Sequence, residues 1–294
     1  MKQVIESLKP KIYKIRTDIY LLSRNKLTFV SLVFIVLLVA LAILAPYIVP
    51  YPKHISDAAN VAFKLTAPCQ EYLFGTDELG RDIFSRIIYG TRISLLASVF
   101  AVALAMLIGI TLGAIAGALG GIVDDIIMRI CDIFLSFPSL LLAIVIAAFA
   151  GPSLRNALIA IAISWWPWYA RIVRGQAISL KERQFVKAAR ALGNVQSKII
   201  FQHIVPNCMG PVIVQATMDL GGIILTLASL SFLGLGAQAP TPEWGLMINT
   251  SKTYFMNAWW YSVFPGLAIF VTVLAFNLIG DGLREIMDPR TRNK

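Results

Sequence analysis

The chain has 294 residues, of which 57% are hydrophobic and 14% are charged, and its mean hydropathy is +0.74. Soluble chains have about a quarter of their residues charged, so this composition leaves too few polar side chains to cover a surface in water. The composition excludes a soluble globular protein and predicts a protein of the bilayer. The net charge of +10 then indicates loops that set a membrane orientation, and it does not require a nucleic-acid partner.

Six apolar stretches are separated by glycine, proline or charge, and they are residues 27–50, 93–119, 126–150, 156–172, 208–236 and 259–281. A helix of about 23 residues rises about 35 Å, which is enough to cross a hydrocarbon core of about 30 Å. The first stretch is much longer than the apolar part of a signal peptide, so we expect it to be retained as an anchor. The expected fold class is therefore all-α, a polytopic membrane protein with six transmembrane helices.

Six spans place both termini on the same side of the membrane. Nineteen of the 26 Lys and Arg residues fall on that side, so the positive-inside rule predicts cytoplasmic termini in a multi-pass protein of the cytoplasmic (inner) membrane. The cytoplasmic parts are then the basic N-terminal tail 1–26, the loop 173–207 and the C-terminal tail 284–294. The extracytoplasmic parts are 51–92 and 237–258. The five-helix permease core is 93–283 and includes the loops 173–207 and 237–258.

Signals for helix packing lie in the second and third spans. A stripe of small residues recurs every four positions in the second span, at Ala101, Ala105, Gly109, Gly113, Gly117 and Gly121. Such a stripe lets helix backbones approach closely, and it fits either plain packing or a sliding surface used in gating. In the third span, Asp125, Arg129 and Asp132 have the spacing of ion pairs along one helical face. Pro138 is expected to kink that span.

Polar and aromatic residues also mark the later spans. Four aromatic residues precede Arg171 and are expected to form an interfacial belt, namely Trp165, Trp166, Trp168 and Tyr169. Asp219 is the deepest lone carboxylate, and an unpaired charge there costs at least about 2.5–3.5 kcal/mol, so we expect it to face protein or water. A proton relay would need more acids and histidines inside the spans, so secondary transport is the weaker hypothesis.

Metal and disulfide chemistry is not expected. The three cysteines, Cys69, Cys131 and Cys208, and the two histidines, His54 and His203, are scattered and form neither a CxxC pair nor a Cys/His cluster.

The loop between the fourth and fifth spans contains a predicted amphipathic helix. Phe185, Ala188, Ala189 and Leu192 fall at helical spacing with basic residues on the other face, and Gly193 is suited to end the helix in a left-handed conformation. Such a helix fits either a lipid surface with acidic headgroups or a partner protein on the cytoplasmic face.

The run Ala188-Ala189-Arg190-Ala191-Leu192-Gly193, with Pro206 thirteen residues after the glycine, resembles the EAA loop of importer-type ABC-transporter permeases. The resemblance implies a coupling helix that docks on the ATPase subunit. Lys187 stands where the motif has glutamate, which leaves the usual acidic contact in doubt. The residues that the resemblance assigns to ATPase coupling are Phe185, Lys187, Ala188, Ala189, Arg190, Leu192, Gly193 and Pro206.

A second stretch, residues 74–86 followed by 90–95, resembles the segment before the second span in C-type subunits of dipeptide/oligopeptide/nickel permeases. Further similarity extends over almost everything after residue 27. The spacing makes Asp77 a plausible helix N-cap and allows Asp82 to pair with Arg86, so a structural use alone would also explain the stretch. The residues of this extracytoplasmic motif are Gly75, Thr76, Asp77, Gly80, Arg81, Asp82, Ser85 and Arg86.

The resemblance implies a type I importer permease without enzymatic activity of its own. No phosphate-cradling loop occurs in the chain, so no cofactor is expected on it, and ATP and Mg would lie on partner ATPase subunits. The implied partners are a second homologous permease, two ABC ATPases, an extracytoplasmic solute-binding protein and membrane lipid. The implied cargo is di- or oligopeptides, with nickel, metal chelates or oligosaccharides as alternatives. A secondary transporter or a channel without ATPase partners is the more distant hypothesis.

Overall fold

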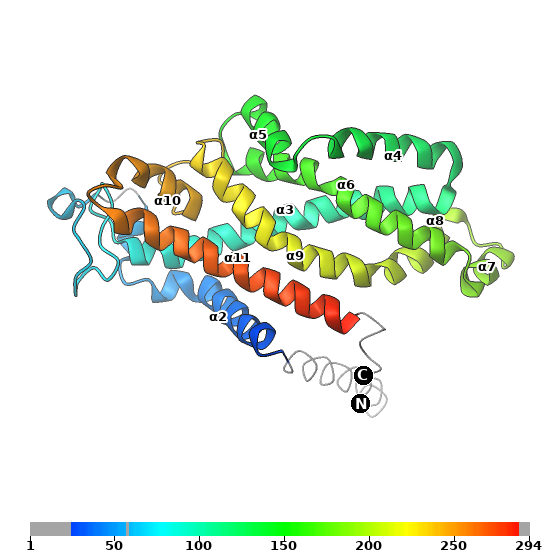
Figure 1. The fold of residues 1–294 in the computed structure, drawn as a ribbon, viewed down its shortest axis with the longest axis horizontal. Coiled ribbons are helices and arrows are strands. Elements are labelled where there is room, and N and C mark those ends of the chain that lie inside the picture. Colours follow the sequence, from blue (N-terminus) through cyan, green and yellow to red (C-terminus); the bar gives the residue numbers. More distant parts are fainter. Residues whose placement is uncertain (1–24, 57–58, 288–294) are drawn as a thin grey trace.

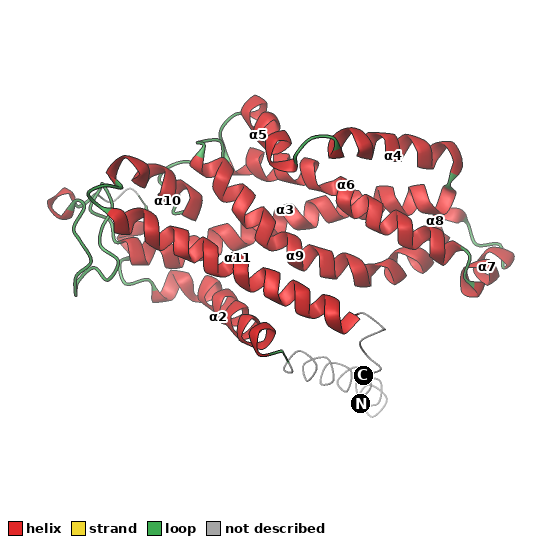
Figure 2. Cartoon of the chain, in the orientation of Figure 1, coloured by secondary structure: helices red, strands yellow, loops and turns green. Residues whose placement is uncertain are grey.

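The computed structural model describes residues 25–56 and 59–287, and these residues form helices and connecting segments without a strand (Figure 2). The helices are α2 (Lys26–Ile48), α3 (Ile83–Leu119), α4 (Gly121–Leu135), α5 (Ser139–Ala150), α6 (Leu154–Lys181), α7 (Gln184–Ala191), α8 (Gln196–Lys198), α9 (Val205–Phe232), α10 (Trp244–Ser251) and α11 (Trp259–Met287). Short 3-10 turns lie at Pro52–Ile55, Val61–Phe63 and Lys252–Tyr254, and a π turn lies at Ile199–Ile204. The predicted tails fall largely outside the described residues.

The long helices form an elongated bundle with different structures at its two ends (Figure 1). One end carries α7, and the opposite end carries α10 and the loops between α2 and α3. The N-terminal helix α2 begins at Asn25, whose side chain accepts hydrogen bonds from the backbone N–H groups of Leu27 and Thr28. It lies beside α11, where the Thr28 hydroxyl is 3.4 Å from the Leu278 carbonyl oxygen.

The centre of the bundle is the contact between α3 and α6. A Cβ atom added at Gly109 would lie 2.5 Å from the Tyr169 Cβ atom, and one added at Gly113 would lie 2.3 Å from the Ala170 carbonyl oxygen. Because only glycine leaves room for this approach, the predicted small-residue stripe is confirmed as a packing surface from Ala101 to Gly117. It is wrong for Gly121, which begins α4, is exposed and would meet nothing within 4 Å of an added Cβ atom. α3 begins at Ile83, ten residues before the predicted span, because its N-cap lies at Asp82.

The third predicted span is two helices instead of one kinked helix. α4 and α5 meet at an angle of 89° across the break at 136–138. Pro138 has no N–H group for the helix and disfavours helical backbone at Phe137, so the chain leaves the helix before it and starts a new one at Ser139.

Four of the described helices are long and apolar enough to cross a membrane, and the count is five when the bent pair α4 and α5 is one span. These four are α2, α3, the continuous helix Gln196–Phe232 and α11. The remaining predicted span corresponds to α6, which is 28 residues long but contains Arg155, Arg171 and Arg174. The six-span count therefore depends on accepting this less apolar helix as a span.

Candidate functional site

The helix α7 projects from one end of the bundle (Figure 1) and rests on it through two side chains. Val186 is fully buried and Ala189 nearly so, and Val186 belongs to the same buried cluster as Ile199, Ile200 and Ile204 of the π turn. The π turn precedes Pro206, which lacks the N–H group that a regular helix would use, and the wider turn accommodates the missing donor.

The outward face of α7 is formed by exposed side chains. Leu192 is 83% exposed, Phe185 is 44% exposed, and Ala188 is also exposed. The Lys187 Nζ atom lies 3.1 Å from the Glu182 Oε2 atom, and both side chains are mostly in solvent. The predicted outward apolar face was therefore wrong for Ala189. This residue points into the protein, where it lies buried together with Val186.

Gly193 ends α7 in the predicted left-handed conformation, with φ of +77°. The backbone N–H group of Asn194 and its side-chain amide both donate to the Ala189 carbonyl oxygen, at 3.3 and 3.0 Å. A Cβ atom at Gly193 would have nothing within 4 Å. The glycine is needed here for its backbone conformation and not for space.

Ion pairs and a hydrogen bond connect the C-terminal half of α6, which leads into α7, to the neighbouring helices α4 and α3. Arg174 of α6 donates two hydrogen bonds to the Asp124 carboxylate of α4, at 2.5 and 2.7 Å, and Arg171 donates one to Asp132 at 2.5 Å. Lys181 donates to the Gly117 carbonyl oxygen near the C-terminus of α3 at 3.1 Å. The predicted pairing of Arg129 with Asp125 and Asp132 is wrong, because α6 supplies the arginine that Asp132 takes.

At the opposite end, the second family motif, residues 74–86, forms a buried polar cluster. The Asp77 carboxylate is fully buried and accepts from the backbone N–H groups of Leu79 and Arg81 and from the Arg81 Nε atom at 2.7 Å. The Arg86 Nε atom lies 3.6 Å from the same carboxylate. The other Arg86 nitrogens donate to the carbonyl oxygens of His54, Ile55 and Pro240. One carboxylate and two guanidinium groups thus join three segments that are distant in sequence.

The cap and the ion pair predicted for this motif are both different in the structure. Asp82, and not Asp77, caps α3 by accepting from the Ser85 N–H group at 2.8 Å. Its own N–H group donates to the His54 Nδ1 atom at 3.0 Å. Arg86 therefore pairs with Asp77 and with carbonyl oxygens instead of with Asp82, because the Asp82 carboxylate already serves the helix N-terminus.

The two motif glycines hold tight turns against other backbone. Gly75 has φ of +72° and Gly80 has φ of +75°. A Cβ atom on Gly80 would lie 1.9 Å from the Asn60 carbonyl oxygen, and one on Gly75 would lie 2.6 Å from that of Thr66. The Thr76 hydroxyl bonds the Phe63 carbonyl oxygen, so the whole motif shapes this end of the protein from inside.

His54 makes the stability of this outer segment depend on pH. Burial lowers the pKa of the His54 imidazole from its ordinary value of 6.5, as do Arg81 and Arg86, while Asp82 and Asp77 oppose the shift. The unfolded chain then binds a proton at His54 more readily than the folded chain does. The contribution of neutral His54 to the free energy of unfolding is therefore fully present above pH about 6.5, and it is lost as the pH falls through the folded-state pKa. Burial raises the pKa of Asp82, which acts in the opposite direction in a more acidic range.

We expect the backbone amides of residues 59–82 to be less protected against hydrogen exchange at pH 5.5 than at pH 7.5, once the rates are corrected for the pH dependence of intrinsic exchange. His54→Asn should remove most of that difference, because an amide oxygen accepts from the Asp82 N–H group without titrating. An equal pH dependence in the variant would contradict the assignment to His54.

Sequence reasoning missed some buried polar groups. Glu243 is almost fully buried, and its carboxylate accepts from the N–H groups of Gly245 and Leu246 at the start of α10 and lies 3.4 Å from the Ser94 hydroxyl oxygen of α3. The Tyr261 hydroxyl bonds Glu78. The Pro242-Glu243-Trp244-Gly245 run was visible in the sequence, but no local pattern showed that its acid is buried.

The aromatic-belt prediction is wrong for most of its members. Tyr169 is fully buried, Trp166 is buried and Trp165 is half-buried, whereas Trp168 is exposed. α6 continues to Lys181, so these residues lie in the middle of a helix and not at its end. Asp219 behaves as predicted, because it accepts from the Gln215 amide at 2.9 Å and is mostly enclosed by protein.

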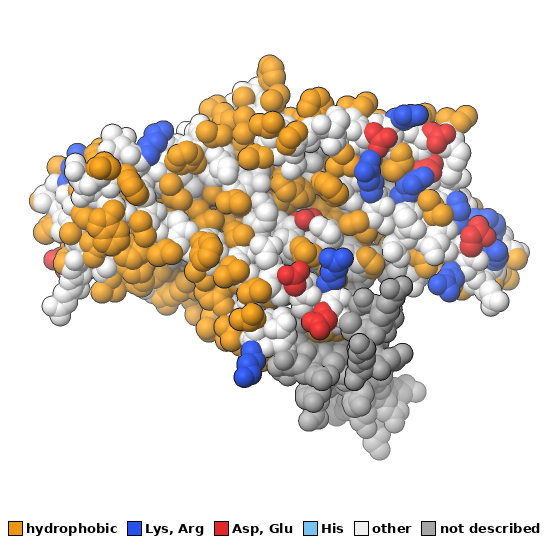
Figure 3. All heavy atoms as spheres, viewed as in Figure 1, with side chains coloured by type: hydrophobic (Ala, Val, Ile, Leu, Met, Phe, Trp, Pro, Cys, Tyr) orange, Lys and Arg blue, Asp and Glu red, His pale blue; other side chains and the backbone are white. Residues whose placement is uncertain are grey.

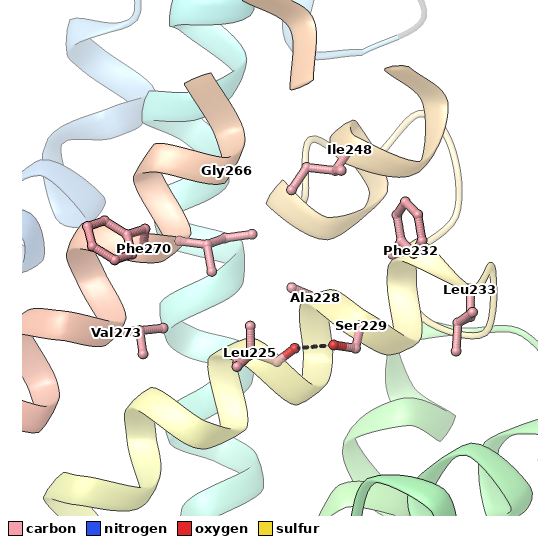
Figure 4. Close-up of a pocket in the computed structure, with 10 residues that line it drawn as sticks. Leu225, Ala228, Ser229, Phe232, Leu233, Ile248, Gly266, Phe270 and Val273 are labelled. Atoms are coloured by element: carbon pink, nitrogen blue, oxygen red, sulfur yellow. Dashed lines mark hydrogen bonds between the residues drawn. The ribbon is translucent and has the colours of Figure 1, made fainter. Parts of the chain in front are cut away.

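The hollows on the surface of the described chain include an apolar groove and a cleft at a helix break. An apolar groove of about 540 Å³ lies between α9, α10 and α11 (Figure 4), and its lining residues include Leu225, Phe232, Ile248 and Phe270. A second cleft, of about 490 Å³, lies at the break between α4 and α5. Among residues 25–56 and 59–287, no group of three or more His, Cys, Asp or Glu side chains is placed to hold a metal ion.

Comparison with known proteins assigns the family. The pattern of binding-protein-dependent transport system inner membrane components matches residues 109–293, and that of the N-terminal transmembrane domain of oligopeptide transport permease C matches residues 20–68. The chain belongs to this permease family. The sequence resemblance to the C-type permeases is therefore confirmed.

The sequence alignments with similar proteins extend over nearly the whole permease chain. It is 50% identical over 272 residues to the dipeptide transport system permease protein of Alkalihalophilus pseudofirmus, a match covering 92% of this chain and 88% of that protein. It is 45% identical over 276 residues to a probable D,D-dipeptide transport system permease protein of Escherichia coli K12, covering 94% and 92%. A glutathione transport system permease protein of Shigella flexneri is 47% identical over 270 residues, covering 92% and 88%.

Solved structures show the same fold at low sequence identity. A chain of the inward-facing MetNI methionine ABC transporter aligns with a TM-score of 0.55 at 18% identity, covering 70% of the permease and 98% of that chain. The expected all-α importer-permease fold is thereby confirmed. The permease presents apolar side chains over most of the face seen in Figure 3, and charged side chains gather toward the end that carries α7.

Proposed function

We propose that this permease is the C-type membrane subunit of an ABC importer that carries di- and oligopeptides. The observation that carries the proposal is 45–50% identity, over more than nine tenths of the chain, to permeases named for dipeptides and glutathione. The described residues offer no cluster for a bare metal ion, which favours peptides over nickel but does not address a metal chelate.

The proposal includes a second permease, two ABC ATPases that bind ATP and Mg, and an extracytoplasmic binding protein. The outward face of α7 supports an ATPase partner, because exposed Leu192 and Phe185 lie among basic side chains at one end of the bundle. Apolar side chains surrounded by charge are typical of a protein interface. The ion pairs from α6 to α4 would transmit movement of α7 into the bundle.

Uptake into proteoliposomes tests this function. The complete complex should import a labelled dipeptide only when its ATPases, ATP and the binding protein are present. Uptake driven by an ion gradient without the ATPases would indicate a secondary transporter, and uptake of nickel chelates or oligosaccharides in place of peptides would change the cargo.

We also propose that both termini are cytoplasmic, supported by the distribution of Lys and Arg. Cysteines introduced at Ser56 and Asn257, both exposed at the end opposite α7, should react with an impermeant reagent on intact cells. A cysteine at Gln196 should not react. Labelling of Gln196→Cys from outside would reverse the orientation.

Leu192→Asp should weaken ATPase binding by about tenfold or more while the permease still inserts normally. Leu192 is exposed in the isolated chain, so the change does not disturb internal packing, whereas a charge in the centre of an apolar interface typically costs about 2 kcal/mol or more. Affinity is measured by titrating purified ATPase against the permease pair in nanodiscs.

Two controls accompany this measurement. Leu73→Asp places the same change on an exposed leucine at the opposite end and should leave affinity unchanged. Lys187→Ala should change affinity by less than tenfold, about 1.4 kcal/mol, because its ion pair is exposed. Wild-type affinity for Leu192→Asp would show that α7 does not contact the ATPase. Ala189→Trp is unsuitable here, since it would lift α7 off its own chain.

A further inference from the structure

With α6 taken as a membrane span, the break between α4 and α5 lies at the depth of the membrane interior. Ser164 of α6 lines the cleft at this break. It is ten residues from the start of α6 and seventeen from its end, about 15 and 25 Å along the helix axis. The cleft is therefore near the middle of the span and not at either surface.

Backbone that leaves a helix at this depth requires polar or protein surroundings. Ser136, Phe137 and Pro138 connect the two helices and are exposed on this chain, and α5 begins without a side-chain cap. The N–H groups of Ser139, Leu140 and Leu141 in the first turn of α5 have no partner within their own helix. Lipid would leave them unpaired at a cost of several kcal/mol each, so such segments occur only inside protein or against a water-filled cavity.

The cleft beside this break has the chemistry of a weak site for a neutral polar chain. Its volume of about 490 Å³ falls in the range of about 300–1,000 Å³ typical of small-molecule sites. Three serines and Trp168 line it together with apolar residues, and no ionisable side chain does. In the described chain the Ser139 hydroxyl and the Trp168 indole N–H group have no hydrogen-bond partner. Ser164 lies at the inner wall of the cleft with 2% of its surface exposed, and its hydroxyl donates to the Ala160 carbonyl oxygen.

We propose that this cleft is one wall of the solute path, where the backbone amides of a passing short peptide exchange hydrogen bonds with Ser139, Ser164 and Trp168. The inference rests on the proposed peptide-import function. Peptide amides match these neutral donors and acceptors, whereas a bare metal cation would find no carboxylate. The absence of ionisable groups in the lining keeps peptide binding weak. Weak binding is necessary in a transport path, because the solute has to leave it again.

The first test is uptake by the complete complex in proteoliposomes. The double variant Ser139→Ala and Ser164→Ala should lower the initial rate of dipeptide uptake at subsaturating peptide by about five- to twentyfold, the effect of losing two neutral hydrogen bonds. Ser98→Ala is the matched control, because Ser98 is fully buried and also donates at 2.8 Å to the carbonyl oxygen four residues earlier, yet lines neither hollow. It should retain uptake within twofold. Co-purification of the other subunits checks that each variant assembles.

The second test measures access of water to the cleft, without using peptide. In a Cys69→Ser background, Ser139→Cys should react with a charged thiol reagent in the assembled complex, either at rest or trapped with vanadate. Leu37→Cys, which is exposed on the anchor helix α2, should not react because it faces lipid.

The outcomes separate the inference from the proposed function. Wild-type uptake by the double variant, or a cysteine at Ser139 that stays unreactive in both states, overturns the inference. An unmutated complex that imports no peptide contradicts the proposed function itself, and with it the peptide assignment of the cleft.

Discussion

Gly113→Leu is expected to prevent the permease from assembling. A Cβ atom at this position would lie 2.3 Å from the Ala170 carbonyl oxygen, 2.9 Å from its Cα atom and 3.0 Å from its carbonyl carbon. All three are backbone atoms of α6, which cannot turn aside as a side chain can. Overpacking commonly costs about 1–3 kcal/mol, and we expect at least the upper end here because the two central helices must separate.

The measurement is the yield and melting temperature of the purified complex. Gly175→Ala is the control, since Gly175 lies on α6 and a Cβ atom there would meet nothing within 4 Å. That variant should be neutral or slightly stabilised. Normal yield and melting temperature in Gly113→Leu would contradict the packing assignment. Normal assembly with lost uptake in the milder Gly113→Ala would instead favour a surface that slides during gating.

Asp77→Asn is expected to destabilise the outer end of the permease by about 3–5 kcal/mol, the usual cost of removing one partner from a buried ion pair. Asp77 is fully buried, and Arg81 and Arg86 are each 4% exposed, so neither guanidinium can move into water. An asparagine side chain retains the size and some hydrogen bonds but not the negative charge. The segment from Leu65 to Arg86 should then unfold locally, and uptake should fall with it.

Limited proteolysis and melting temperature report this change. Glu71→Gln is the matched control, because Glu71 is an exposed acid six residues away and should tolerate the change within about 0.5 kcal/mol. If Asp77→Asn remained as stable and as resistant to protease as the unmutated permease, the two arginines would have to be neutralised by another group.

Much of the candidate coupling surface was predictable from local sequence, but its orientation was not. The helical spacing of residues 184–192 and the glycine after them depend only on near neighbours, and both were confirmed. Which side of α7 faces the protein was decided by Ile199, Ile200 and Ile204, which form one buried cluster with Val186. Pattern alone treated Ala189 and Leu192 as one face, since helical spacing says nothing about where the neighbouring chain lies.

The sequence by itself determined that this protein is helical, lies in a membrane and belongs to the importer permeases. Mean hydropathy and sequence motifs depend only on residues that are close together in the chain. Only the tertiary structure decided the partners of the charged side chains. Arg86 donates to Pro240, 154 residues further along the chain, and Asp132 pairs with Arg171, 39 residues away. A charged side chain takes whichever partner the fold brings within reach, whereas sequence spacing identifies only the candidates one helical turn away.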